Sequence, residues 1–277
     1  MEHLRKDERK HIVSSLDPKE NPIVDELVKK SYVVLSDVDY TLFSFDEGHA
    51  NGQKELARIF GENFSSEVNH LFRLTLEGQR RPITEVWSHR MVYSSLIKKI
   101  QALQSAFIDT YGIKVFSREA EIAIAADLLG VSLNKELIEH GRDAYWDAVG
   151  NAEAIYPDAQ VFVDTIHKKS IPLILMSGSD SIMKVKEDCS FDYDPDMSSA
   201  YKEKRFEKFK FPFATSVFGD PYDKPTIPFF EKVFQVIQDE LGYQPAPEKI
   251  LVVGDSERND LEVPFKRGCT TLLIKRN

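Results

Sequence analysis

The sequence is poor in cysteine and has no long apolar run. Its 277 residues include two cysteines, Cys189 and Cys269, so it predicts no disulfide framework. No segment approaches the ~20 apolar residues that a membrane-spanning helix needs. The charged N-terminal segment, MEHLRKDERKHIV, has no apolar stretch of the kind found in secretory signals. We therefore expect a cytoplasmic protein that does not enter a membrane.

An excess of basic charge is also missing. Lys and Arg number 36 against 45 Asp and Glu, which gives a net charge of −9. Surfaces that bind nucleic acid or anionic membranes are usually basic, so the composition argues against both as partners. A small anionic substrate is compatible with this charge, because a local site is enough to hold it. Nothing in the sequence specifies an oligomeric state.

Five short apolar runs predict a parallel sheet. Each is rich in Leu or β-branched residues and is bounded by Gly, Asp or Pro, as is typical of strands buried on both faces. Helical patterns over 158–169 and 226–241 separate later runs, and this alternation predicts a doubly wound α/β fold, similar to a Rossmann fold. The runs are 32–35, 172–176, 214–218, 250–253 and 270–274.

Residues 48–155 read instead as almost wholly helical. One helix pattern opens after Ser117, an N-cap candidate, and ends at Gly130. A helical block inserted directly after the first strand is most simply a second domain, a cap over the sheet. The α/β core then comprises residues 1–47 and 156–277, with a short helix expected over Pro22 to Lys30.

Residues 184–212 form a charged and aromatic excursion between two core strands, which we expect to be a flap or a helical hairpin. Four of its acids have the 1, 3, 5 and 12 spacing of a calcium loop: Asp192, Asp194, Asp196 and Glu203. Met197 stands where such a loop needs glycine. The pattern therefore favours a solvated acidic loop over a cation site.

Polar residues follow the predicted strands where each strand ends. In open α/β sheets, ligands bind at the carboxyl ends of the strands. Asp37 and Asp39 are two residues apart after the first run, so both side chains can face one site. The other polar residues at this predicted rim are Ser177, Lys224, Asp255 and Asp260.

This set of side chains suits phosphoryl transfer through a carboxylate nucleophile. A carboxylate can attack phosphorus, a second acid can move the proton, and a lysine and a hydroxyl can orient the phosphoryl oxygens. Each signal alone is weak, since a D-x-D pair is often a turn or a helix cap and a single lysine is often a surface residue. The order of four such signals, each after its own strand, favours the functional interpretation.

The motifs are similar to those of the haloacid dehalogenase (HAD) superfamily. They are Asp37–Thr41, Ser177 after Leu-Met, Lys224–Pro225 and Gly254–Asp260, in the family's order. The resemblance covers about residues 31–46 and 156–277. The helical block resembles the cap that many members insert after the first motif.

The resemblance implies a role for each matching residue. Asp37 would be the nucleophile, and Asp39 the general acid and base. Ser177 and Gly178 would bind the transferring phosphoryl group, and Lys224 would bridge it to Asp37. Phosphatases and phosphomutases of the family carry an acid two residues after the nucleophile, whereas dehalogenases lack it, so Asp39 argues against dehalogenation.

The resemblance also implies Mg²⁺ as the cofactor. Asp37, the backbone carbonyl of Asp39 and Asp255 would bind the ion directly. Asp260 would hold a water molecule on the ion. Such a set of oxygen ligands is what Mg²⁺ prefers.

Together these observations predict a Mg²⁺-dependent phosphatase that hydrolyses a small phosphorylated metabolite through an aspartyl-phosphate. A phosphomutase on the same core and a non-catalytic binding protein of the same fold stay open as alternatives. In the cap, the basic stretch with Arg80 and Arg81 is either a substrate contact or a solvated helix connection.

Overall fold

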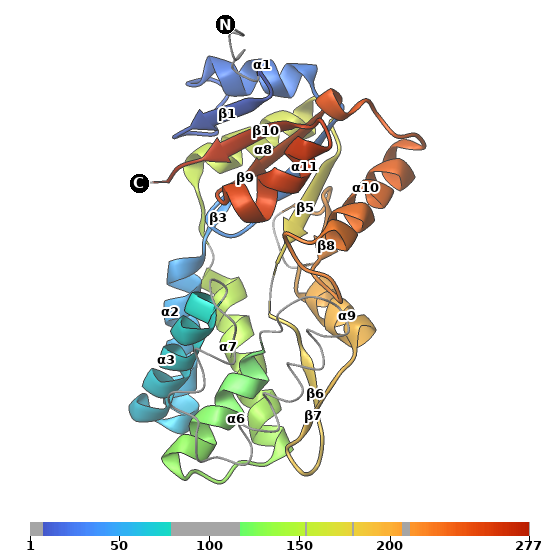
Figure 1. Ribbon diagram of the computed structural model, residues 1–277. Helices are drawn as coiled ribbons and strands as arrows, with labels where there is room; N and C mark the ends of the chain where they lie inside the picture. Colours follow the sequence, from blue (N-terminus) through green and yellow to red (C-terminus); the bar gives the residue numbers. More distant parts are fainter. Residues whose placement is uncertain (1–7, 79–116, 153, 179, 207–210, 277) are drawn as a thin grey trace, which may run out of the picture.

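The computed structural model of the chain describes residues 8–78, 117–152, 154–178, 180–206 and 211–276. These residues form an α/β core and a helical cap, stacked end to end (Figure 1). The core holds one six-stranded sheet in which every neighbouring pair is parallel. In sheet order the strands are β1 (Lys10–Val13), β10 (Thr270–Ile274), β9 (Ile250–Gly254), β2 (Val33–Asp37), β5 (Leu173–Ser177) and β8 (Thr215–Phe218).

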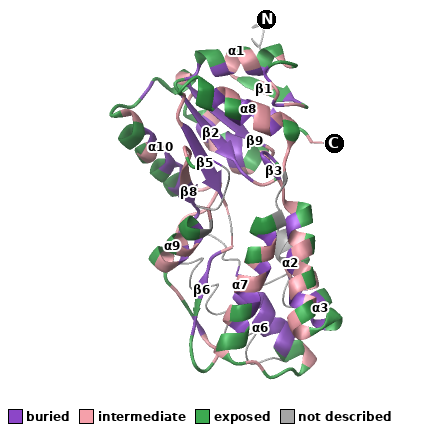
Figure 2. Cartoon of the chain, turned by 180° about the vertical axis from the view of Figure 1, so that it is seen from behind, coloured by how far each residue is buried: buried purple, intermediate pink, exposed green. Residues whose placement is uncertain are grey.

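Burial on both faces explains why five of these strands were predicted. Every residue of β2, β5, β9 and β10 is buried, and in Figure 2 the central strands of the sheet have the colour of buried residues. The sixth strand, β1, was not predicted. It lies at the edge of the sheet, where only Val13 is buried and Ile12 is 61% exposed, so its segment carries no continuous apolar run.

Helices cover both faces of the sheet, as the predicted doubly wound fold requires. Helices α1 (Pro22–Lys30) and α8 (Pro157–Lys168) share one buried apolar cluster with the strands. Helix α10 (Ile227–Leu241) forms a second cluster with the other face, near the short helix α11 (Glu262–Lys266). Alternate strand residues contribute to each cluster: Val34 belongs to the first, and Val33 and Leu35 belong to the second.

The cap consists of α2 (Phe45–Phe60), α3 (Glu62–Gly78), α6 (Arg118–Leu129) and α7 (Lys135–Ala152) in the described residues. Helix α2 packs on α3 and α7, and α6 packs on the same two helices. Ser117 caps α6 through the Ala120 amide, and Gly130 ends it with a φ of 65°, as predicted. None of the described helices is both long and apolar enough to cross a membrane.

Two short strands join the cap to the core. They are β3 (Phe43–Ser44) and β4 (Ala154–Ile155), which pair in antiparallel register. The chain therefore enters and leaves the cap through one two-stranded ribbon.

The excursion forms a β-hairpin and one helix rather than a helical hairpin. The hairpin pairs β6 (Met183–Val185) with β7 (Phe191–Tyr193), and α9 (Pro195–Phe206) follows it. We call residues 181–206 the strap. Its hairpin packs on the cap helices α6 and α7, whereas α9 packs on β8 of the core (Figure 1).

The four acids of the predicted acidic loop lie on the strap and do not gather. Asp192 is a strand residue that pairs with Lys186 at 2.7 Å. Asp194 accepts hydrogen bonds from the Asp196 and Met197 amides at the start of α9. Among the described residues, these acids form no cluster that could hold a metal ion.

Candidate active site

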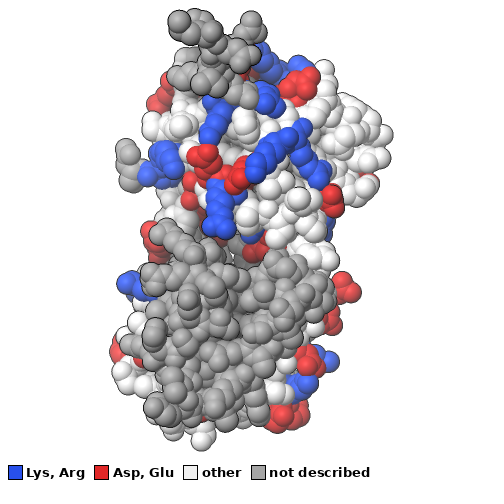
Figure 3. Space-filling view, viewed as in Figure 1, with Lys and Arg blue, Asp and Glu red and all other residues white. Residues whose placement is uncertain are grey.

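The carboxyl ends of four strands bring the predicted polar residues to one rim of the sheet. Strand β2 lies between β9 and β5, and it ends at Asp37. Ser177 is the last residue of β5, and Asp255 directly follows β9. Lys224 comes from the loop after β8. On the face that Figure 3 shows, acidic and basic side chains of the core lie close together near the cap.

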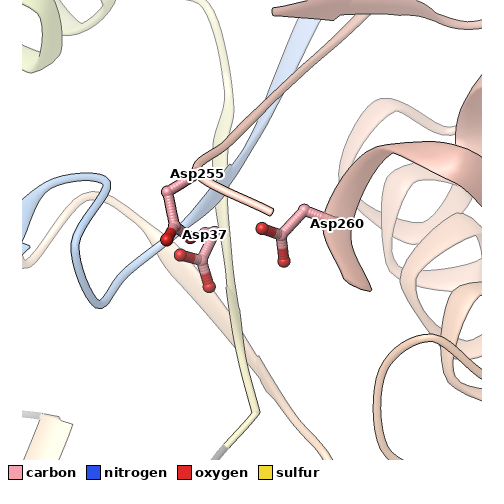
Figure 4. Close-up of side chains that lie close together, drawn as sticks. All are labelled: Asp37, Asp255 and Asp260. Atoms are coloured by element: carbon pink, nitrogen blue, oxygen red, sulfur yellow. The ribbon is translucent and has the colours of Figure 1, made fainter. Parts of the chain in front are cut away.

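Three carboxylates gather at this rim. Oxygen atoms of Asp37, Asp255 and Asp260 all lie within 4.8 Å of one another, and Figure 4 shows the three side chains around a common space. Asp37 and Asp260 are buried. Asp260 is held in place by a π-helical turn (Glu257–Leu261), and its Oδ2 accepts a hydrogen bond from the Ser256 amide at 3.0 Å.

Lys224 lies beside two of these carboxylates. Its Nζ donates to Asp37 Oδ1 at 2.5 Å, to Asp260 Oδ1 at 2.8 Å and to the Met176 carbonyl at 3.2 Å. Burial by itself lowers the pKa of Lys224, but the carboxylates of Asp260 and Asp37 raise it above its ordinary value. The lysine is therefore held as an ammonium ion.

One lysine does not neutralise three carboxylates. Burial, followed by repulsion from Asp37, raises the pKa of Asp255 to about 6 and that of Asp260 to about 7, although Lys224 opposes both shifts. These shifts indicate excess negative charge in a desolvated site. A divalent cation would relieve that charge, and the all-oxygen donor set fits Mg²⁺.

Two glycines allow this close packing. A Cβ on Gly254 would lie 2.4 Å from the Cβ of Asp260, so any side chain there would displace the acid. A Cβ on Gly178 would lie 2.7 Å from Asp223 Oδ1 and 3.2 Å from Lys224 Cε. The glycine after Ser177 therefore makes room for the loop that carries Lys224, which we call the lysine loop (219–226).

The second oxygen of Asp37 is also held. Thr41 Oγ1 donates to Asp37 Oδ2 at 2.9 Å from within a tight turn, in which Tyr40 has a φ of 57°. The Thr41 carbonyl accepts a hydrogen bond from Arg276 Nη2 at 2.5 Å, and Arg276 pairs with Asp158 at 2.8 Å. Neither Thr41 nor Arg276 was predicted to have a role. The spacing of Thr41 to Asp37 could have indicated the first contact, but no local pattern points to the second.

Asp39 lies between the core and the cap. It is partly exposed, and its negative charge is one of the causes that raise the pKa of Tyr145 on α7, where burial is the largest cause. The same charge contributes to the raised pKa of Tyr40, again behind burial. Asp39 also forms an isolated β-bridge with Phe43, which belongs to the ribbon that joins the cap to the core.

A buried arginine of the cap approaches the loop that follows β5. Arg118 Nη2 lies 3.2 Å from the hydroxyl of Tyr145 and 3.5 Å from Asp180 Oδ2, and its guanidinium lies 4.7 Å from the ring centre of Phe72. Asp180 follows Ser177 by three residues. Arg118 was not predicted from the sequence, because it lies within a helix pattern that contains no motif. Arg80 and Arg81, the predicted substrate contacts, lie outside the described residues.

No protein-family model and no curated protein match the chain. Among solved structures, magnesium-bound YfnB from Bacillus subtilis is similar at 16% identity, covers 88% of each chain and has a TM-score of 0.48. A HAD phosphatase from Thermococcus onnurineus is 16% identical over 88% of this chain and 86% of its own, with a TM-score of 0.39. A 2-haloacid dehalogenase from Pseudomonas syringae pv. Tomato DC3000 is 12% identical over the same shares, with a TM-score of 0.48. Likenesses this low do not decide the chemistry, so the proposals below rest on the residues of the site.

Proposed function

We propose that the protein is a Mg²⁺-dependent phosphatase of the HAD type that hydrolyses a small phosphomonoester. The observation that carries the proposal is the setting of Asp37. Lys224 holds one of its oxygens and Thr41 holds the other, beside the acids Asp255 and Asp260. This arrangement fixes a carboxylate where the sheet ends, beside a positive charge and two further acids that could bind a metal ion.

The reaction would proceed in two steps on Asp37. A carboxylate oxygen of Asp37 attacks phosphorus, and the bond from phosphorus to the ester oxygen breaks. Asp39 donates its proton to the departing oxygen, which leaves as the alcohol. Asp39 then takes a proton from water, and the resulting hydroxide attacks the aspartyl-phosphate, which releases phosphate and restores Asp37.

The surrounding groups would stabilise charge on the phosphoryl oxygens. Lys224 would contact these oxygens while bridging to Asp37, and Ser177 with the Gly178 amide would bind on the other side. Bound Mg²⁺, with Asp37, the Asp39 carbonyl and Asp255 as ligands and Asp260 through water, would neutralise charge on the same oxygens. The cap above the rim favours a small substrate, because it limits the space beside the reacting phosphate.

The proposal is tested by assaying phosphate release from p-nitrophenyl phosphate and a panel of phosphorylated metabolites with Mg²⁺. We expect hydrolysis of at least one ester, and a loss of about a thousandfold or more in Asp37→Asn. Circular dichroism of the variant checks that it folds. Conversion of a sugar phosphate without phosphate release would indicate a phosphomutase instead, and full activity of Asp37→Asn would exclude the aspartyl-phosphate route.

A further inference from the structure

The strap and the cap share one apolar core, although they are separate insertions in the chain. Met183, Val185 and Phe191 of the strap hairpin are buried in the same cluster as Ile122 and Tyr145 of the cap helices. Separating the hairpin from the cap would expose these apolar side chains to water, which is unfavourable. The strap hairpin therefore moves with the cap.

Buried polar contacts reinforce this attachment. The Glu119 carboxylate, which is fully buried on α6, accepts a hydrogen bond from the Met183 amide at 3.2 Å and pairs with Arg142 at 3.1 Å. The hydroxyl of Tyr201 on α9 donates to Asp143 of α7 at 2.7 Å. Both ends of the strap thus contact the cap through specific groups.

The strap is also fixed to the core at one carboxylate, that of Asp220. Lys202 Nζ pairs with Asp220 Oδ2 at 2.6 Å, and both side chains are almost fully buried, at 5% and 0% exposure. The hydroxyls of Tyr193 and Ser181 donate to Asp220 Oδ1 at 2.7 Å and 3.4 Å. All three donors belong to the strap, whereas Asp220 belongs to the loop that follows β8.

That loop carries Lys224, four residues further on. Asp223 lies against Gly219 and Gly178 and accepts the amide hydrogen of Lys224 at 2.6 Å. A shift of Asp220 would therefore move Lys224 relative to Asp37, because the intervening residues are closely packed.

We propose that Asp220 and Lys202 are positioning residues that couple the position of the cap to that of Lys224. The cap and the strap move as one unit, and the buried Lys202–Asp220 pair transmits that movement to the lysine loop. The catalytic consequence rests on the proposed function. The physical coupling does not, since it concerns only contacts between the strap and the loop.

The test compares three variants of the full chain: Lys202→Met, Lys202→Arg and Tyr193→Phe. Lys186→Met is the matched control, because Lys186 pairs with Asp192 on the same hairpin but both side chains are about half exposed, at 45% and 54%. Hydrogen exchange is followed in peptides that cover the lysine loop (219–226), α6 and α7. Steady-state kinetics are measured with p-nitrophenyl phosphate.

We expect Lys202→Met to raise exchange about tenfold in both the lysine loop and the cap helices. Its kcat should fall about thirtyfold with KM changed less than threefold, and Lys202→Arg should restore most of kcat. Tyr193→Phe, which removes one hydrogen bond and keeps the ion pair, should give smaller changes in the same direction. Lys186→Met should change neither quantity.

Two results would overturn the proposal. The first is unchanged exchange in the lysine loop of both Lys202→Met and Tyr193→Phe. The second is a rise in the lysine loop of Lys202→Met with no rise in α6 and α7. If the unaltered protein hydrolyses no ester, the proposed function fails, but the exchange measurement still decides whether the strap couples the cap to the loop.

Discussion

The molecule buries charged side chains in two places, the rim of the sheet and the interior of the cap. At the rim, the carboxylates of Asp37, Asp255 and Asp260 surround the single ammonium group of Lys224. In the cap, two arginines face two glutamates at comparable burial. The cap pairs are Arg118 with Glu121 at 2.5 Å and Arg142 with Glu119 at 3.1 Å.

The difference lies in the balance of charge. In the cap, each of these carboxylates has its own guanidinium, so the two pairs are neutral; Asp180 and Asp143, which pair with the same arginines, are more exposed than the glutamates. At the rim the acids outnumber the lysine, and the pKa values of Asp255 and Asp260 rise accordingly. Buried charge that the fold leaves uncompensated therefore indicates a binding site, whereas buried charge in matched pairs indicates a structural role.

The largest expected effect is a loss of activity when a charged residue of the rim is replaced. Lys224→Met removes the ammonium from both Asp37 and the bound phosphate, so kcat for phosphate release should fall about a thousandfold or more. The measurement is phosphate release at saturating ester with Mg²⁺, with circular dichroism as the check on folding. Activity within tenfold of the unaltered protein would contradict the role assigned to this lysine.

In the cap, the corresponding change should affect stability instead. Glu121→Gln leaves the buried Arg118 without its closest carboxylate, which should lower the free energy of unfolding by about 3 kcal/mol. Urea unfolding measures this change, and kcat of the folded protein should stay within about fivefold.

Glu262→Gln is the matched control for that variant. It breaks an exposed pair with Lys266 and should lower the free energy of unfolding far less than Glu121→Gln does. Equal losses of stability in the two variants would show that the buried pair of Arg118 and Glu121 stabilises the fold no more than the exposed pair does.

A third prediction concerns pH and an acid next to the rim. Burial, with repulsion from Asp220, raises the pKa of Asp223 to about 6, although Lys224 and Lys202 oppose the shift. The folded protein therefore holds this proton up to about pH 6, whereas the unfolded chain releases it near pH 4. Its contribution to stability is present at low pH and is lost as pH rises through that range. A shift of about 2 pH units corresponds to about 2.7 kcal/mol.

Asp223→Asn cannot ionise, and its side-chain oxygen can still accept the Lys224 amide hydrogen. Urea unfolding without divalent cations should show the variant close to the unaltered protein at pH 4.5. At pH 7.5 the variant should be more stable, by up to about 2.7 kcal/mol. A difference that does not depend on pH would mean that Asp223 titrates normally in the folded protein.

The smallest expected effect is stabilisation by the metal alone. Mg²⁺ at ten times its Kd should raise the free energy of unfolding by about 1.4 kcal/mol, because it binds the folded rim and not the unfolded chain. Asp255→Asn should lose this gain, whereas Glu121→Gln should keep it. If Mg²⁺ raised the free energy of unfolding equally in all three proteins, the metal would bind at a site other than the rim.

The core sheet was predictable where strands are buried on both faces. Such strands leave continuous apolar runs in the sequence, as β2, β5, β9 and β10 do. The edge strand β1 and the strap hairpin leave no such run, because β1 buries only Val13 and the short strand β6 has exposed Lys184 between two buried residues. Their pairing depends on partners that are distant in the sequence or that belong to the cap.

The candidate site was predictable to the extent that it follows strand ends. Asp37, Ser177 and Asp255 each end or follow a predicted strand, and the parallel sheet brings those ends together. The contact of Arg276 with the Thr41 carbonyl spans most of the chain and has no local signature. Asp220 has no local signature either, because its three strap donors lie 18 to 39 residues before it in the chain.

The ribbon of β3 and β4 has a consequence for exchanging parts between proteins. Because Ser44 pairs with Ala154, the two ends of the cap leave the core side by side, and a cap could be replaced by cutting at this one place. A graft made there alone would expose Met183, Val185 and Phe191 to water, since the residues that they pack against belong to the removed cap. A transplanted cap therefore needs its strap, and the two form a single module with four junctions.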